Sequence, residues 1–155
     1  QLYDVLDVVG RRFQEVFSQL FGGGTAQIVL TDPDNILTGG IDFYIQPPGK
    51  KRQQLTLLSG GERALTVIAL LFSFLDYRPA PFCVLDEVDA ALDEANVERF
   101  SSYLKRVNKE TQFIVVSHRK KTMEAAEVLQ GVTMVERGVS RLLTVAFEDV
   151  KEDLA

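Results

Sequence analysis

Apolar residues near the amino end of the chain recur with alternating spacings of four and three residues. This spacing aligns an apolar stripe along a helix and is typical of a coiled-coil seam or a packed amphipathic helix. The stripe consists of Leu2, Leu6, Val9, Phe13, Val16 and Leu20. The pattern predicts a helix over 2–20, and the glycines at 22–24 are expected to end it. A triple glycine also suits a phosphate loop, but no lysine follows at the required place.

Alternation of apolar and polar residues replaces the helical pattern over 26–30 and 41–45. Turn-forming residues at 32–35 separate the two stretches, which therefore predict an antiparallel strand pair. A Pro-Pro-Gly break at 47–49 leads into a basic patch at 50–52, formed by two lysines and an arginine. Such a patch is usually a solvated loop, and contact with DNA or another phosphate is the alternative.

Helix and strand patterns alternate in the second part of the chain. Residues 64–75 are apolar nearly all round, which predicts a helix buried on most sides. Short apolar runs at 82–85 and 113–116 predict central parallel strands covered on both faces. Between these runs, Asp93 can cap a helix that reaches about Lys109.

Smaller elements are expected toward the carboxyl end. The sequence predicts a short helix near 122–127. Apolar stretches at 132–135 and 142–147 flank a turn at 137–138 and predict a terminal hairpin. Strands that alternate with helices indicate an α/β domain with a largely parallel sheet flanked by helices.

The composition excludes several classes of protein. With 155 residues, 46% hydrophobic and 25% charged, the chain has the size and balance of one globular domain. A net charge of -5 argues against broad nonspecific adhesion to nucleic acid or anionic lipid. One cysteine is too few for a disulfide framework, so a reducing compartment is favoured. One cysteine and one histidine are also too few for a structural zinc site. No apolar run is long enough to span a bilayer, and no signal peptide is recognised. The first residue is Gln1 rather than Met, which leads us to expect a piece of something longer.

A Leu-Ser-Gly-Gly-Glu run at 58–62 stands directly before the expected apolar helix. Ser59 as N-cap with Glu62 three residues later forms a capping box. Capping does not explain Gly60 and Gly61, because glycine is unfavourable by roughly 1 kcal/mol inside a helix. Bare backbone N–H groups at the positive end of a helix suit an anion, so the run also predicts a phosphate site.

Polar residues also follow both expected parallel strands. Asp86 and Glu87 end the first strand, and Ser117 and His118 end the second. Ligands of open α/β sheets bind at the carboxyl ends of the strands. Neighbouring carboxylates on an extended chain point in different directions, so one can serve a magnesium ion while the other addresses a water molecule. Capping of the following helix is the simpler explanation for such acids.

Taken in order, these motifs resemble those of ABC-type ATPases. LSGGE at 58–62 is similar to the signature motif, VLDEVDAALD at 84–93 to Walker B with the D-loop, and VVSHRK at 115–120 to the switch-histidine region. The glutamate of the signature and the DEVDAALDEAN wording resemble the SMC branch, the structural maintenance of chromosomes proteins. The resemblance is to the C-terminal half of the bacterial SMC head and runs from FGGG at 21–24 through the terminal hairpin.

One motif of that class is missing from the chain. No G-x-x-x-x-G-K-[ST] loop occurs, because Gly49-Lys50 is followed by Lys51. In the family that loop lies in the N-terminal half of the head, which a coiled coil and a hinge separate from this half. The resemblance therefore implies a C-terminal lobe of a P-loop ATPase head over 22–155, with residues 1–21 as the coiled-coil helix that enters it.

The resemblance also implies roles for individual residues. Asp86 would hold Mg²⁺ on ATP, Glu87 would orient the attacking water, and His118 would contact the γ-phosphate. Ser59, Gly60, Gly61 and Glu62 belong to the signature, whose serine and glycines would cover the γ-phosphate bound to a second head. Asp89 and Asp93 are expected in the loop that crosses the interface between the heads.

The partners implied by the resemblance are the N-terminal half of the same head, a second head in an ATP-dependent dimer, a kleisin subunit with a winged-helix domain, and DNA in the full complex. The terminal hairpin is the candidate kleisin surface. The implied function is ATP hydrolysis between engaged heads, which drives chromosome organisation and segregation in the cytoplasm at the nucleoid. Two alternatives are a kleisin-binding module with no activity of its own and the head half of a DNA-repair relative. That repair branch normally lacks the Arg-Lys found at 119–120.

Overall fold

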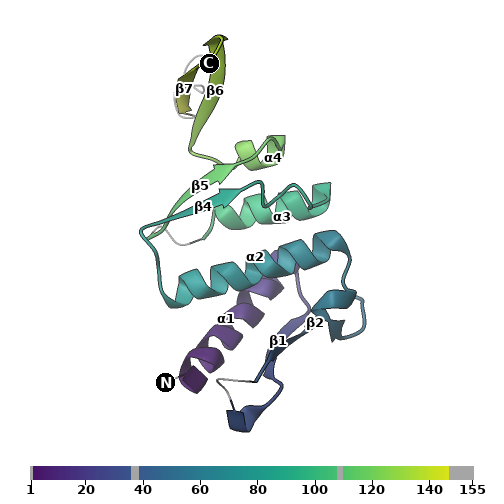
Figure 1. The fold of residues 1–155 in the computed structure, drawn as a ribbon. Coiled ribbons are helices and arrows are strands. Elements are labelled where there is room, and N and C mark those ends of the chain that lie inside the picture. The colour runs from purple at the N-terminus through teal and green to yellow at the C-terminus, as the bar shows by residue number, and fades with distance from the viewer. Residues whose placement is uncertain (1, 36–38, 108–109, 147–155) are drawn as a thin grey trace.

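The computed structural model describes residues 2–35, 39–107 and 110–146. Its α-helices are α1 (Leu2–Phe21), α2 (Gly60–Tyr77), α3 (Glu94–Leu104) and α4 (Lys120–Met123). Its strands are β1 (Thr25–Leu30), β2 (Ile41–Gln46), β3 (Gln53–Gln54), β4 (Phe82–Asp86), β5 (Gln112–Val116), β6 (Val128–Glu136) and β7 (Val139–Ala146). Short 3₁₀ turns occupy Pro33–Asn35 and Leu55–Leu57. Figure 1 shows α2 between two groups of elements, with α1 and the β1–β2 pair on one side and β4, β5 and α3 on the other.

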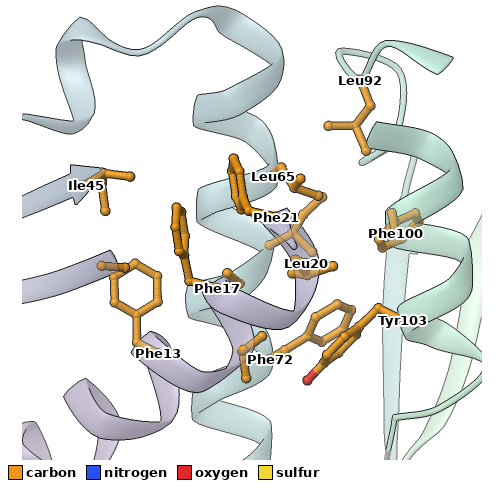
Figure 2. Close-up of a cluster of buried hydrophobic side chains, with 14 of the residues drawn as sticks. Phe13, Phe17, Leu20, Phe21, Ile45, Leu65, Phe72, Leu92, Phe100 and Tyr103 are labelled. Carbon is orange, nitrogen blue, oxygen red and sulfur yellow. The ribbon is translucent and has the colours of Figure 1, made fainter. Parts of the chain in front are cut away.

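Helix α1 carries the predicted apolar stripe into the core. Val9, Phe13, Val16 and Leu20 are buried, as the spacing predicted, and Phe17 joins them. In Figure 2 Phe21 of α1 lies beside Leu65 of α2, while the rings of Phe13 and Phe17 lie on the side of Ile45. Phe72 of α2 stacks on Tyr103 of α3 with ring centroids 5.0 Å apart. The amphipathic face of α1 therefore packs within this chain.

The turn after α1 brings β1 back against the helix. Gln14 of α1 fixes this turn, because its side-chain amide donates to the Gly24 carbonyl and accepts from the Ala26 N–H at 2.8 Å. Gly24 has φ +85°, and a Cβ on it would lie 2.3 Å from the Gln46 carbonyl oxygen of β2. Strands β1 and β2 pair antiparallel from Thr25–Gln46 to Leu30–Ile41, which confirms the predicted pair and the glycine helix stop.

Helix α2 begins at Gly60, with Ser59 as its N-cap. Leu65, Ile68, Ala69 and Phe72 are buried, but a stripe on another side of the helix is exposed. The exposed stripe consists of Val67, Leu71, Phe74 and Tyr77. The prediction of burial on most sides is therefore confirmed, except along this one stripe, which no described element covers.

Strands β4 and β5 pair in parallel, as predicted, with Phe82 opposite Gln112 and Asp86 opposite Val116. They form one two-stranded sheet, and the other two sheets of the described residues are antiparallel. A largely parallel sheet is therefore not found in the described residues. One face of the pair, with Cys83, Leu85, Phe113 and Val115, lies on the core.

The other face of the β4–β5 pair is open. Its apolar residues are Phe82, Val84, Ile114 and Val116, each about half exposed or more. We call these four residues the open sheet face. The prediction that both strands are covered on both faces is wrong, because the helices of this chain pack on one side only.

The remaining elements differ from the predictions mainly in their bounds. Asp93 caps α3 as predicted, by accepting from the Asn96 N–H at 2.8 Å, but the helix ends at Leu104 rather than near Lys109. The short helix α4 lies at Lys120–Met123, ahead of its predicted place. The terminal hairpin β6–β7 is confirmed and is longer than predicted, and in Figure 1 it projects from the rest of the chain. No helix among the described residues is both long and apolar enough to cross a membrane.

Candidate functional site

The parallel pairing of β4 and β5 brings the predicted polar residues to one sheet edge. Asp86 ends β4, Glu87 follows it, and Ser117 and His118 follow β5. The Nδ1 atom of His118 lies 3.9 Å from Oε1 of Glu87, and both side chains are largely exposed. In Figure 1 the carboxyl ends of β4 and β5 and the amino ends of α2, α3 and α4 lie toward the same side of the molecule. The sheet edge therefore presents an acid, a histidine and several helix starts to one side.

The backbone of Glu87 has an unusual conformation. Its φ is +48°, which makes it the one described non-glycine residue with a positive φ. Left-handed backbone is rare for a residue with a long side chain, and such strain clusters at functional sites. The Glu87 N–H donates to the Val116 carbonyl of β5 at 2.9 Å, which holds the turn in place. Sequence reasoning found Glu87 but missed this turn, because glycine, the usual signal for such angles, is absent there.

Ser59 and Glu62 form the predicted capping box. The Glu62 N–H donates to Ser59 Oγ at 3.4 Å, and the Ser59 N–H donates to Glu62 Oε2 at 3.3 Å. Ser59 and Gly60 are exposed, and a Cβ placed on Gly60 would meet nothing within 4 Å. The start of α2 is therefore open to an approaching group, as the phosphate-site interpretation requires.

Glu62 also joins the basic patch to the start of α2. Lys50 Nζ lies 2.8 Å from Glu62 Oε1. Burial alone would raise the pKa of Glu62, but hydrogen bonds from Lys50 and Ser59 outweigh it and lower the pKa. Arg52 sits 4.7 Å above the Tyr44 ring. Lys50 and Arg52 thus have partners within the chain, and all three basic residues at 50–52 are exposed.

Asp89 and Asp93, which bracket the loop before α3, lie in different environments. Asp89 is fully buried, and its Oδ2 accepts hydrogen bonds from Ser117 Oγ and Thr122 Oγ1 at 2.5 Å each. These bonds tie the loop after β4 to the segment after β5 and to α4. Asp93 is exposed and caps α3, and its place at an interface between heads stays a prediction.

The signature run lies beside this acidic loop without bonding to the sheet edge. A Cβ on Gly61 would lie 3.4 Å from the Ala91 carbonyl oxygen, so α2 starts against the loop that follows Glu87. Among the described residues, no hydrogen bond or ion pair joins Ser59 or Glu62 to Asp86, Glu87 or His118. The two groups of candidate residues are neighbours on one side of the molecule rather than one connected cluster.

The donor set fits a magnesium ion held mainly by a nucleotide. Among the described residues, no group of three or more histidine, cysteine or acidic side chains could enclose a metal. Asp86 offers one exposed carboxylate beside Glu87. Mg²⁺ in nucleotide sites is commonly bound by one or two carboxylates together with phosphates and water, so a single aspartate is sufficient.

An exposed acid pair follows β4, and a histidine follows β5. A glycine-rich helix start lies on the same side of the molecule. This arrangement agrees with the resemblance to ABC-type ATPases. The chain belongs to the RecF/RecN/SMC family, because the family model described as "RecF/RecN/SMC N terminal domain" matches residues 28–141. Within it, the chain matches SMC head ATPase proteins.

Two curated relatives are both called "Chromosome partition protein Smc". The protein from Bacillus subtilis (strain 168) is 60% identical over 149 residues, which cover 96% of this chain and 13% of that protein. The protein from Lactiplantibacillus plantarum is 56% identical over 147 residues, covering 95% of this chain and 12% of that protein. The chain therefore spans about an eighth of the length of these relatives.

Solved structures show the same fold. One, described as "Structural biochemistry of ATP-driven dimerization and DNA stimulated activation of SMC ATPases", has a TM-score of 0.86 and 36% identity over 99% of this chain and 92% of that chain. Another is described as "Crystal structure of the SmcHead bound to the C-winged helix domain of ScpA" and has a TM-score of 0.86, with 37% identity over 97% of this chain and 46% of that chain.

Proposed function

We propose that this chain is the C-terminal half of an SMC head that hydrolyses ATP between two engaged heads during chromosome organisation and segregation. The observation that carries the proposal is the sheet edge where Glu87 and His118 lie 3.9 Å apart, beside Asp86. Phosphoryl transfer to water relies on a metal ion, on a residue that positions the water and on stabilisation of the phosphate charge. The proposal assigns these three tasks to Asp86, Glu87 and His118.

The proposed division of work follows from where each side chain lies. Glu87 orients the attacking water and accepts its proton, because its carboxylate is exposed on a turn fixed by the Val116 carbonyl. His118 donates a hydrogen bond to the γ-phosphate. Asp86 holds Mg²⁺, which when bound neutralises charge on the phosphate oxygens. These groups work mainly by positioning and by electrostatic stabilisation.

The signature residues are proposed to act on the nucleotide of a partner head. Ser59 and Gly60 are exposed and have no bond to the sheet edge of their own chain, which suits contact with a second molecule. The solved SMC ATPase structure whose description names ATP-driven dimerization matches 99% of this chain, which supports ATP-driven dimerisation here. A site completed by association couples the nucleotide state to dimerisation.

The exposed apolar surfaces support the proposal of a half-head. The open sheet face and the exposed stripe of α2 present large apolar side chains outward, and contiguous apolar surface marks an interaction site. The chain also lacks a G-x-x-x-x-G-K-[ST] loop. We propose that the N-terminal half supplies that loop and covers the open sheet face.

The kleisin and DNA complete the proposed assembly. Heads related to this chain are described as bound to the C-winged helix domain of ScpA. We propose the hairpin β6–β7 as the docking surface for such a domain, because Val132 and Leu142 on it are both mostly exposed. DNA binding and a place in the cytoplasm at the nucleoid belong to the same proposal.

Reconstitution tests the function directly. The chain is mixed with an N-terminal head half that carries a G-x-x-x-x-G-K-[ST] loop, and phosphate release from ATP is measured. The mixture should hydrolyse ATP while either half alone does not, and Glu98→Gln, an exposed change on α3, should leave the rate unaltered. A stable mixture without ATPase activity would instead favour an interaction module that binds the kleisin or a partner head.

A further inference from the structure

We propose that Asp89 is a positioning residue that holds Glu87 and His118 in register across the sheet edge. The inference rests on the proposed ATPase function and adds to it a buried hydrogen-bonded network between the two catalytic loops. Asp89 lies two residues after Glu87, and its bonding partner Ser117 directly precedes His118. The network therefore connects the neighbours of both candidate catalytic residues.

The side chain of Asp89 is the centre of this network. It is fully buried, and its Oδ2 accepts from Ser117 Oγ after β5 and from Thr122 Oγ1 in α4, both at 2.5 Å. Hydrogen bonds to an ionised carboxylate are stronger than those between neutral groups. One carboxylate thus ties three segments of the chain together: the loop after β4, the loop after β5 and the helix α4.

Arg119 closes the network from the other direction. Its backbone N–H donates to Ser117 Oγ at 2.9 Å, so that hydroxyl both donates to Asp89 and accepts from Arg119. Its guanidinium donates to the carbonyls of Ala90 and Leu92, the latter at 3.0 Å. The residues on both sides of His118 are therefore bonded to the loop that carries Glu87.

This network supports a strained turn. Glu87 keeps its left-handed backbone with one hydrogen bond to Val116 and with its carbonyl accepting from the Ala90 N–H at 3.0 Å. Such strain persists only where the surroundings over-determine it. With the Asp89 bonds removed, the loop is free to relax, and Glu87 moves relative to His118. Displacements of about 1 Å at a catalytic group can cost roughly 100-fold in rate.

Stability alone does not account for the aspartate. Asp89 Oδ1 and Arg119 Nε are both buried and have no hydrogen-bond partner among the described residues. A buried charge with unused bonding capacity lowers stability, and apolar replacements of such groups are often neutral or stabilising. A network with this cost is better explained by the geometry it maintains at the two catalytic residues.

The single histidine of the chain gives a direct test of that geometry. The imidazole signals of His118 in an NMR spectrum of the 155-residue chain are unambiguous, since no other histidine is present. Asp89→Asn, Ser117→Ala and Thr122→Val should shift or broaden these signals. Thr122→Ser, which keeps the hydroxyl, should restore them, and Ser102→Ala, at an exposed site on α3, should leave them as in the wild type.

The reconstituted head supplies the second measurement. The same variants should lower kcat about 10- to 100-fold with little change in KM for ATP, because the network positions groups and does not touch nucleotide. In a His118→Ala background the Ser117→Ala change should lower kcat much less than it does in the wild type, as expected for residues that act as a unit. Ser117→Ala and Thr122→Val keep the test available where Asp89→Asn does not fold.

Three results would overturn the inference. They are unchanged His118 signals in Ser117→Ala and Thr122→Val, kcat within about twofold of the wild type in these variants, or a full additional loss on top of His118→Ala. An inactive wild-type head would count against the proposed function instead, while the His118 signals would still decide whether Asp89 holds the histidine.

Discussion

The adjacent carboxylates Asp86 and Glu87 at the sheet edge differ in backbone conformation. Asp86 is the last residue of β4 and lies opposite Val116 in the ladder, whereas Glu87 has already turned into left-handed backbone. The two side chains therefore leave the chain in different directions. At the residue scale, the proposed division between a metal ligand and a water-orienting base rests on this change of conformation over one peptide bond.

Glu87→Gln in the reconstituted head should abolish turnover while ATP-dependent dimers accumulate. Glutamine keeps the size of the side chain but cannot accept a proton from water, so about 10²- to 10⁴-fold in rate should be lost. Asp86→Asn should instead weaken binding of the magnesium nucleotide and produce few dimers. Phosphate release and sedimentation with ATP measure the two effects, and identical behaviour of the two variants would contradict the separate roles.

Ser59 contributes to the stability of this chain independently of any nucleotide. Ser59→Ala removes the oxygen that accepts from the Glu62 N–H, and loss of an N-cap costs about 1 kcal/mol. Ser59→Gly should cost less, a few tenths of a kcal/mol by the same measure. Urea unfolding of the isolated chain gives both values. Equal stability of wild type and Ser59→Ala would show that the capping box contributes nothing here.

At the scale of elements, the packing of β1 and β2 against α1 depends on how closely the chain turns after the helix. Gln14 satisfies backbone groups of both Gly24 and Ala26, and the turn leaves no room for a side chain at Gly24. A helix stop alone needs only the left-handed angles that glycine adopts. The contact between Gly24 and the Gln46 carbonyl adds a steric requirement that is particular to this fold.

A pair of alanine substitutions separates these two requirements. Gly22 and Gly24 both have positive φ, but a Cβ on Gly22 would meet nothing within 4 Å. Gly22→Ala should lower the free energy of unfolding by roughly 1–2 kcal/mol, because the backbone there is left-handed. Gly24→Ala should cost clearly more, because the new Cβ would collide with the Gln46 carbonyl. Denaturant unfolding of both variants is the measurement. Equal losses of stability would show that β2 moves away from the new Cβ without destabilising the chain.

Features that depend on neighbours in the sequence were predictable, and those that depend on distant segments were not. The stripe of α1 and the capping box at Ser59 follow from spacings within a few residues, and both are confirmed. The exposure of Val84 depends on what covers a strand, which an apolar run does not encode. Likewise, the burial of Asp89 arises only when the segment after β5 closes over its loop. The motif spacing identified most of the candidate site but not the bonds that hold it.

At the scale of the whole molecule, apolar surface is distributed unevenly. The core lies between α1, α2 and α3, while the open sheet face, the stripe of α2 and the hairpin present large apolar side chains outward. The proposed function assigns the N-terminal half to the open sheet face and a kleisin domain to the hairpin. The open sheet face gives the sharpest test, because its strands pack on the core with their other face, whereas the hairpin projects from the rest of the chain.

Val84→Lys should prevent assembly with the N-terminal half and leave the isolated chain folded. Val84 is 55% exposed here, so a charged side chain reaches water in the free chain, and surface substitutions usually change stability by about 0.5 kcal/mol or less. In the assembled head the same lysine would be buried without a partner, which costs several kcal/mol. Val132→Lys makes the same chemical change on the hairpin, where Val132 is 71% exposed, and should allow assembly. Co-purification with the N-terminal half and urea unfolding of the chain alone measure the two properties. Normal assembly of Val84→Lys would mean that some other surface joins the two halves.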